Sequence, residues 1–218
     1  MIEIDVVSDV ICPWCYIGQY RLKTALNDGQ SDSVALRWQP FQLNPLMPKT
    51  GMDRGLYLAR KFGGANRAKD IYSAIACQAS KDGLKVDFDA IRRTPNTLDA
   101  HRLISWSERT GCQDEVVSSL FRAYFCEGRD IGTISVLTAI ADNAGMDPAD
   151  VAERLASGVD RERVARQSHH HQTSGIDGVP VFLVDGRILA HGAQPASFWN
   201  QVIPTLAGRR NPDTSGRS

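Results

Sequence analysis

The N-terminal hydrophobic pattern changes from extended to helical and back to extended. Residues 2–8 alternate at first and then become continuously apolar and β-branched, which predicts a strand entering a buried sheet. From Pro13 onward apolar residues recur every three to five positions, which predicts a helix ending at the Asn27-Asp28-Gly29 stop signal. Residues 34–40 predict a second strand. Strand, helix, strand is how a parallel α/β unit begins.

The middle of the chain, residues 52–174, has helical periodicity almost throughout. Short Gly or Asn/Asp stops separate its apolar faces, and no segment between them resembles a strand. A series of helices with short connections is typical of a compact helical subdomain. We expect helices near residues 56–62, 68–82, 97–107, 116–125, 134–141, 148–156 and 160–173.

Strand patterns return at residues 181–185 and 188–191, joined by Asp185-Gly186, a two-residue hairpin signal. A closing amphipathic helix starts near Pro195, and residues 208–218, which lack an apolar anchor, are predicted to be disordered. The predicted order is β-α-β, helices, β-β-α. The fold class is therefore α/β, with one domain formed by residues 1–48 and 175–207 and a helical insertion at 49–174.

The composition of the chain argues against nucleic-acid binding, membrane association and secretion. The chain of 218 residues is 42% hydrophobic and 23% charged, as in ordinary globular proteins. Lys+Arg and Asp+Glu each number 25, so the basic excess of a nucleic-acid or membrane-surface binder is missing. The N-terminus has acids where a signal peptide has basic residues, and no apolar run is long enough to span a membrane. We expect a cytoplasmic protein with neither a nucleic-acid nor a membrane partner.

Two of the five cysteines form the motif Cys12-Pro13-Trp14-Cys15, at the start of the first predicted helix. Thiol–disulfide exchange needs one thiolate to attack and a second thiol to resolve the mixed disulfide. A helix N-terminus stabilises the first thiolate, and the second sulfur lies one turn further on. Cys12 is predicted to be the nucleophile and Cys15 the buried resolving thiol. Because Trp14 supplies no charge, we expect a less oxidising site than one with histidine between the cysteines.

The same spacing is also half of a zinc site. The sequence contains no second pair of this kind, and the strand before and helix after the motif favour redox chemistry. We therefore expect no metal, but a zinc or metal-binding module remains the third hypothesis.

Val179-Pro180 stands directly before an apolar strand, and proline within a sheet is confined to special positions such as the first residue of a strand. A cis bond here would present the backbone N–H and C=O of Val179 beside the sulfurs, where an extended substrate segment pairs as in strand addition. The alternative is a trans proline that merely begins the strand. Pro13, Trp14, Val179 and Pro180 are the predicted substrate-binding residues.

A set of motifs resembles the FrnE-type branch of the DsbA family. They are Cys12-Pro-Trp-Cys15-Tyr-Ile-Gly18, Trp38-Gln-Pro-Phe41-Gln-Leu-Asn-Pro45, Asn96-Thr97 with Ala100-His-Arg-Leu103, Ala123-Tyr-Phe125, and Gly178-Val-Pro-Val-Phe182 with Gly192-Ala-Gln-Pro195. The resemblance covers residues 2 to 205. It implies a thioredoxin fold with an all-helical insertion between the second and third strands, a cis-proline loop, and disulfide oxidoreductase or isomerase activity.

The resemblance also bears on cofactors and partners. We expect a redox-active disulfide and no separate cofactor, although glutathione stays open as a co-reactant. The partners would be thiols or disulfides of proteins or small molecules, and a homodimer stays open.

A neighbouring branch contains 2-hydroxychromene-2-carboxylate isomerases and kappa-class glutathione transferases. Those enzymes have serine where Cys12 stands, and they carry an Asp-Arg pair after the glycine that here precedes Ala193-Gln194-Pro195. Both departures count against a glutathione-dependent isomerase or transferase, which remains the alternative function.

Three further features are weighed beside the motif. Asp9 is either a proton relay for the resolving thiol or a residue that caps the helix. His169, His170 and His171 are either a solvated helix end or modulators, one of which reaches the cleft and stabilises the Cys12 thiolate or joins the two cysteines in binding zinc. The remaining cysteines, Cys77, Cys112 and Cys126, are expected to be small buried hydrophobic residues, with Cys112 and Cys126 too far apart along one helix to pair.

Overall fold

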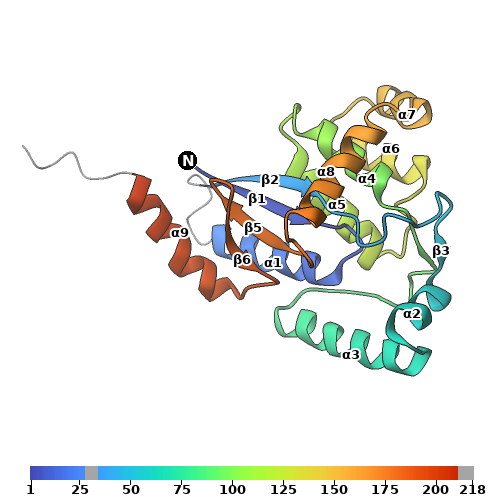
Figure 1. The fold of residues 1–218 in the computed structure, drawn as a ribbon, viewed down its shortest axis with the longest axis horizontal. Coiled ribbons are helices and arrows are strands. Elements are labelled where there is room, and N and C mark those ends of the chain that lie inside the picture. Colours follow the sequence, from blue (N-terminus) through green and yellow to red (C-terminus); the bar gives the residue numbers. More distant parts are fainter. Residues whose placement is uncertain (28–33, 211–218) are drawn as a thin grey trace, which may run out of the picture.

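The computed structural model describes residues 1–27 and 34–210, and these form a four-stranded sheet in the order β2-β1-β5-β6 (Figure 1). β1 (Ile2–Ser8) pairs in parallel with β2 (Val34–Pro40), from Ile2 opposite Val34 to Ser8 opposite Pro40. β5 (Val181–Val184) is antiparallel to β1, and β6 (Arg187–His191) is antiparallel to β5. The predicted order β-α-β, helices, β-β-α is confirmed.

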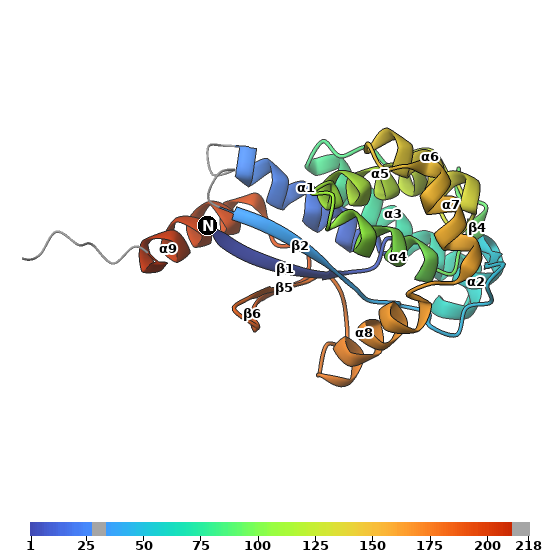
Figure 2. The same cartoon turned by 90° about the horizontal axis from the view of Figure 1, so that it is seen from above.

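Helices cover both faces of this sheet (Figure 2). α1 (Pro13–Asn27) and α9 (Ala196–Arg210) pack against each other, and α8 (Arg161–Thr173) lies across the opposite face and contacts β2. Trp199 of α9 is fully buried, with its ring centroid 4.6 Å from that of Phe182 on β5. This contact attaches the closing helix to the sheet.

Two predicted boundaries extend beyond the described residues. α1 ends at Asn27 as predicted, but Asp28-Gly29 of the stop signal is not described. α9 continues to Arg210, into the segment 208–218 that was predicted to be disordered, and residues 211–218 lie outside the described part.

The remaining helices lie between β2 and β5 along the chain. Their bounds are α2 (Arg54–Phe62), α3 (Ala65–Lys81), α4 (Leu98–Ser107), α5 (Gln113–Phe125), α6 (Ile134–Asn143) and α7 (Pro148–Ser157). α4 to α7 gather beside one end of the sheet, whereas α2 and α3 form a separate pair (Figure 1). The expectation that this region contains no strand was wrong, because β3 (Met52–Asp53) pairs with β4 (Arg93–Thr94). Two residues are too few to produce an alternating pattern.

Aromatic packing connects α1 to the helical region. The ring centroid of Tyr16 lies 5.3 Å from that of Phe121 and 5.5 Å from that of Phe125, both on α5. Phe121 and Phe125 are fully buried and belong to the same apolar cluster as the β1 side chains. The helix that begins at the cysteine motif is therefore held by sheet and helices together. None of the described helices has the length and apolar character needed to cross a membrane.

Candidate functional site

The cysteine motif lies where β1 ends and α1 begins. The Cys12 carbonyl accepts hydrogen bonds from the backbone N–H groups of Cys15, at 3.1 Å, and Tyr16, at 3.3 Å, which starts the helix. Cys12 is 5% exposed and Cys15 is 1% exposed, and neither forms a disulfide. Trp14 is 39% exposed, so an apolar side chain lies at the surface between the two cysteines of the motif.

The two thiols have opposite electrostatic environments. The pKa of Cys12 is lowered, first by its hydrogen bond with the Cys15 side chain and also by the backbone N–H groups of Cys15 and Trp14. Burial and the negative charge of Asp9 act against this. Burial raises the pKa of Cys15 well above its usual value, and the hydrogen bond and charge of Cys12 raise it further. Cys12 is therefore the thiol that ionises first.

The loop before β5 lies against the motif, although it is distant in sequence. The Val179-Pro180 peptide bond is cis, and the Cys12 thiol donates a hydrogen bond to the Val179 carbonyl at 3.5 Å. A Cβ added to Gly18 on α1 would lie 3.1 Å from Cγ of Pro180, so this glycine permits the close approach of the loop. The structure thus brings the Cys12-Pro13-Trp14-Cys15 motif and Val179-Pro180 together.

A buried acid–histidine pair lies behind the motif. Asp9 is 0% exposed, and its Oδ2 accepts a hydrogen bond from the Leu43 N–H at 2.8 Å. Its Oδ1 lies 3.4 Å from Nε2 of His101, which is also 3.1 Å from the Phe41 carbonyl oxygen. The sequence indicates Asp9 as a candidate but no role for His101, although His101 stands in the Ala100-His-Arg-Leu103 motif. A lone histidine on an apolar helix face, such as α4, carries no signal of its partner.

Ser8 extends this polar cluster toward Cys15. Its hydroxyl is buried with no hydrogen-bond partner among the described residues, and it acts to lower the pKa of Cys15. Ser8 and His101 both line a cavity of about 10 Å³. That volume is about what one water molecule needs. Ser8 therefore acts on Cys15 and shares this small cavity with His101.

The histidine run lies at the C-terminal end of α8. His169 and His170 are exposed, and burial together with His170 lowers the pKa of the half-buried His171. No hydrogen bond or ion pair among residues 1–27 and 34–210 joins the three to Cys12 or Cys15. The described part of the structure therefore shows no polar contact between the run and the motif.

The other cysteines were predicted wrongly to be buried. Cys77 is exposed on α3, and Cys112 and Cys126 are partly exposed at the two ends of α5. Their thiols instead contact polar groups, with Cys112 beside the Thr110 hydroxyl and Cys126 beside the Tyr16 hydroxyl. Within the described part of the chain, no group of three or more His, Cys, Asp or Glu side chains is arranged to hold a metal ion.

Comparison with known proteins identifies the fold. The profile of the DSBA-like thioredoxin domain matches residues 3–203. The chain is 27% identical to the probable DsbA oxidoreductase SCO1869 from Streptomyces coelicolor, with a TM-score of 0.84 over 98% of this chain and 93% of that one. It is 25% identical over 194 residues to the uncharacterized protein YwbO of Bacillus subtilis (strain 168), covering 88% of this chain and 91% of YwbO. These matches confirm the predicted thioredoxin fold with a helical insertion.

Two more distant structures share the fold at identities that show nothing further. One is a 2-hydroxychromene-2-carboxylate isomerase, 15% identical with a TM-score of 0.71 over 96% of this chain and 98% of that one. The other is the cytosolic disulfide reductase DsbM from Pseudomonas aeruginosa with GSH. It is 17% identical, with a TM-score of 0.65 over 96% of this chain and 100% of DsbM.

Proposed function

The chain belongs to the DSBA-like thioredoxin domain family, and from this premise we propose that it is a thiol–disulfide oxidoreductase acting through Cys12 and Cys15. The observation that carries the proposal is the opposite direction of the two thiol pKa values, lowered at Cys12 and raised at Cys15. Exchange needs one thiol that ionises readily and one that stays protonated until the first bond has formed.

The proposed reaction transfers two electrons and two protons. The Cys12 thiolate attacks a substrate disulfide, one substrate sulfur leaves and is protonated, and a mixed disulfide forms. Cys15 then loses its proton and attacks the Cys12 sulfur, which releases the second substrate thiol and leaves a Cys12–Cys15 disulfide. The same steps in reverse oxidise a substrate dithiol. The reduction potential of the pair, compared with that of its compartment, sets the direction.

The substrate segment is proposed to bind at the Val179-Pro180 loop. The Val179 carbonyl lies within 3.5 Å of the attacking sulfur, so a strand paired with the Val179 backbone brings its own sulfur close to Cys12. The exposed ring of Trp14 and the Pro13 ring add an apolar surface next to this edge. Such a surface suits either a peptide or a small thiol.

Asp9 is the proposed acceptor of the Cys15 proton, with His101 beside it to share the charge. Asp9 is fully buried, and its Oδ1 has no hydrogen-bond partner among the described residues, so this oxygen is available to accept a proton. His101 Nε2 lies 3.4 Å from Oδ1, and Ser8, whose hydroxyl acts on the Cys15 thiol, lines the same small cavity as His101. His101 thus joins the predicted residues as a positioning residue.

The proposed function includes a cellular location and a small-molecule thiol partner. We propose a cytoplasmic location for this chain, since DsbM, which shares the fold, is named a cytosolic disulfide reductase. Its structure with GSH supports a small-molecule thiol as one partner of this chain.

Reduction of insulin disulfides by the wild type, Cys12→Ser and Cys15→Ser tests the function. We expect no turnover by Cys12→Ser, and a trapped mixed disulfide with Cys15→Ser. Iodoacetamide should modify Cys12 of the reduced protein below pH 9.0, the ordinary thiol pKa, and should spare Cys15. Full insulin reduction by Cys12→Ser would overturn the proposal. Glutathione-dependent turnover of a chromene carboxylate that survives Cys15→Ser would favour the isomerase instead.

A further inference from the structure

An unpaired cation is buried at the start of α2. Arg54 is 6% exposed, and its Nη1 donates to the Thr94 hydroxyl at 3.4 Å and the Tyr124 hydroxyl at 3.2 Å. Its Nε and Nη2 are buried and have no hydrogen-bond acceptor among the described residues. No ion pair of the described residues includes Arg54. A guanidinium cannot lose its proton in a protein, so the charge has no counter-ion from this part of the chain.

Aromatic rings compensate this charge only in part. The guanidinium carbon lies 4.8 Å from the Tyr72 ring centroid and 5.9 Å from that of Tyr124. A ring face attracts a cation but accepts no strong N–H hydrogen bond in the guanidinium plane. The Tyr72 hydroxyl also acts on the guanidinium, but no acceptor among the described residues lies in hydrogen-bond geometry at Nε or Nη2, and leaving buried donors unsatisfied is costly.

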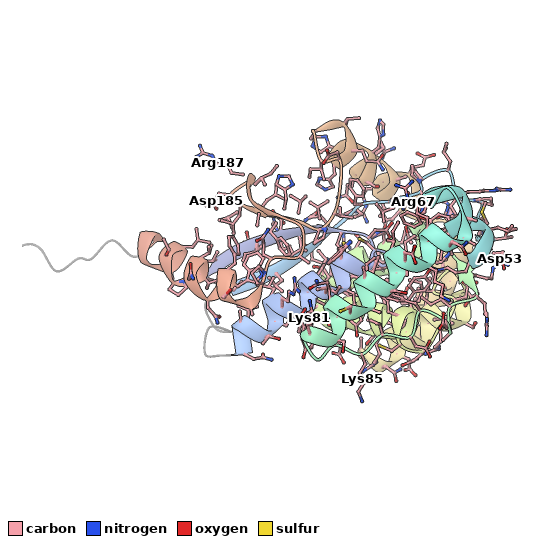
Figure 3. All side chains as sticks on the ribbon, turned by 90° about the horizontal axis from the view of Figure 1, so that it is seen from below. Asp53, Arg67, Lys81, Lys85, Asp185 and Arg187 are labelled. Atoms are coloured by element: carbon pink, nitrogen blue, oxygen red, sulfur yellow. The ribbon has the colours of Figure 1, made fainter. Side chains whose placement is uncertain are left out.

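Arg54 lies in the wall of a cavity of about 400 Å³. α2, whose cap Asp53 is labelled in Figure 3, lies beside the end of α3 that carries Arg67, and the segment after α3 runs back along that helix (Figures 1 and 3). Residues of all three segments line the cavity. Its apolar wall includes Leu58, Ala68, Ala76, Val86 and Phe88.

We infer that this cavity binds a small monocarboxylate with an apolar body, and that the free edge of Arg54 anchors the carboxylate. Nε and Nη2 lie on one edge of the guanidinium, and their parallel N–H bonds match the two oxygens of a carboxylate. The volume lies within the usual range for small-ligand pockets. Both nitrogens are covered in the free chain, so the carboxylate reaches them only when a wall side chain such as Tyr72 moves aside.

Charged residues around the cavity limit which anions it can bind. Lys69 is exposed on the wall and supplies a second cation, whereas the exposed Asp87 and Asp89 are anions on the same wall. Asp87 is already engaged, since its Oδ1 accepts the Ala90 N–H at 3.0 Å. Two carboxylates near the ligand repel a doubly charged phosphate or dicarboxylate more than a single carboxylate. A monocarboxylate therefore fits better than phosphate.

The cavity lies near the Cys12–Cys15 pair, since the charge of Cys12 acts on Tyr72 of its wall, but the inferred ligand does not depend on the proposed redox function. Neither cysteine lines the cavity. Ligand binding by Cys12→Ser separates the two ideas, because that variant should lose exchange activity and keep the ligand.

Matched probes test the assignment. The full chain is titrated with hydrocinnamate, its neutral amide and inorganic phosphate, by calorimetry and by the shift in melting temperature. We expect hydrocinnamate to bind and the amide and phosphate to bind at least about tenfold more weakly. Arg54→Met should lose hydrocinnamate binding, and Arg60→Met, which removes an exposed arginine from the same helix outside the cavity wall, should retain it.

A second variant keeps the test informative if Arg54→Met folds poorly. Ala76→Phe fills the cavity and leaves Arg54 intact, so it should abolish binding while the far-ultraviolet circular dichroism stays unchanged. Equal binding of acid and amide, unchanged binding by Arg54→Met or Ala76→Phe, tighter binding of phosphate, or no binding of any probe at millimolar concentration would each overturn the inference.

Discussion

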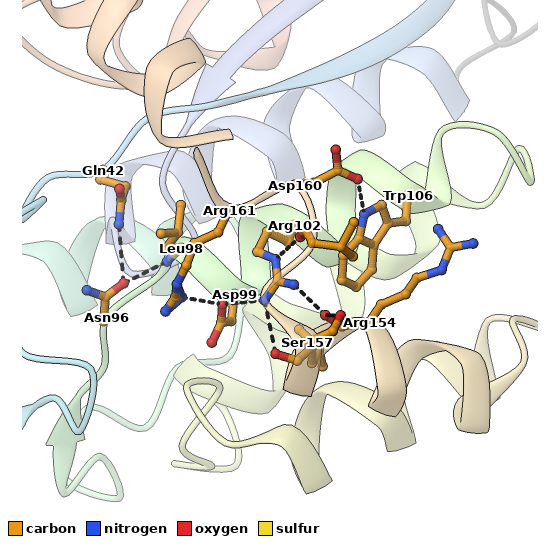
Figure 4. Close-up of polar contacts among 12 residues, drawn as sticks. Gln42, Asn96, Leu98, Asp99, Arg102, Trp106, Arg154, Ser157, Asp160 and Arg161 are labelled. Atoms are coloured by element: carbon orange, nitrogen blue, oxygen red, sulfur yellow. Dashed lines mark hydrogen bonds and ion pairs between the residues drawn. The ribbon is translucent and has the colours of Figure 1, made fainter. Parts of the chain in front are cut away.

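Two buried arginines in the helical region differ in one respect, which is how much of the guanidinium the chain itself satisfies. Arg102 on α4 is 0% exposed, and its Nη1 lies 2.8 Å from Oδ1 of Asp99 (Figure 4). Its Nε donates to the Val159 carbonyl at 2.8 Å, and its other donors reach the Arg154 and Leu155 carbonyls. Arg54 has a similar burial, but two of its three guanidinium nitrogens, Nε and Nη2, have no acceptor from the described chain.

The difference separates a structural arginine from one suited to bind a ligand. The Arg154 and Leu155 carbonyls belong to the last turn of α7, where carbonyls have no partner within the helix. Arg102 therefore satisfies that helix end and is satisfied by it. Arg54 supports no helix end and no carboxylate, so its unused edge is available for a ligand.

The largest expected effect on stability is at Arg102, the arginine whose donors the chain satisfies. Arg102→Met leaves Asp99 buried without its partner on α4 and leaves the α7 carbonyls without a donor. We expect the free energy of unfolding to fall by about 3–5 kcal/mol, measured by urea denaturation. Arg166→Met is the control, because Arg166 is 72% exposed in a surface pair and should cost at most about 1 kcal/mol. Equal losses in the two variants would contradict the structural role.

A smaller loss is expected when only the charge of the partner is removed. Asp99 Oδ1 accepts from Arg102 at 2.8 Å and from Arg161 at 2.9 Å. Asp99→Asn keeps the shape and one acceptor oxygen, so we expect a loss of about 1–3 kcal/mol in the same denaturation experiment. Adding Asp99→Asn to Arg102→Met should cost less than the sum, since both remove one interaction. Full additivity would show that the two residues do not act as a unit.

The network around Arg102 also predicts an acid-dependent effect. Hydrogen bonds from Arg163 and Trp106 lower the pKa of Asp160 from 3.8 to about 2. A carboxyl with a lowered folded pKa contributes stability above its unfolded pKa, and loses that contribution as the pH falls through the folded value. The difference in melting temperature between wild type and Asp160→Asn should therefore shrink from about pH 4 to about pH 2. Asn tolerates the positive φ at this position, so backbone strain does not confuse the comparison. A constant difference would exclude this titration.

The sequence predicts the frame of this molecule better than its buried polar contacts. Periodicity gives the strands, the helix behind Cys12 and the order of elements, because those patterns are local. Asp9, between β1 and α1, lies close to His101 on α4, and no local pattern marks a contact between residues so far apart in the sequence. The same holds for the arginines, since Arg54 and Arg102 look alike in a helical face until the acceptors around each are known. β3 and β4 could not be predicted because each contains only two residues, too few for an alternating pattern.

The smallest effect on stability is expected at Arg54, and this measurement distinguishes Arg54 from Arg102 most directly. Arg54→Met removes two hydrogen bonds and two ring contacts, but it also removes a buried charge that has no counter-ion among the described residues. Replacing an uncompensated buried charge by an apolar side chain is often neutral or stabilising. We expect the free energy of unfolding without ligand to change by no more than about 1 kcal/mol, measured beside Arg102→Met with the same substitution. A loss as large as that of Arg102→Met would mean that the chain already satisfies Arg54, and the case for a ligand at its free edge would fail with it.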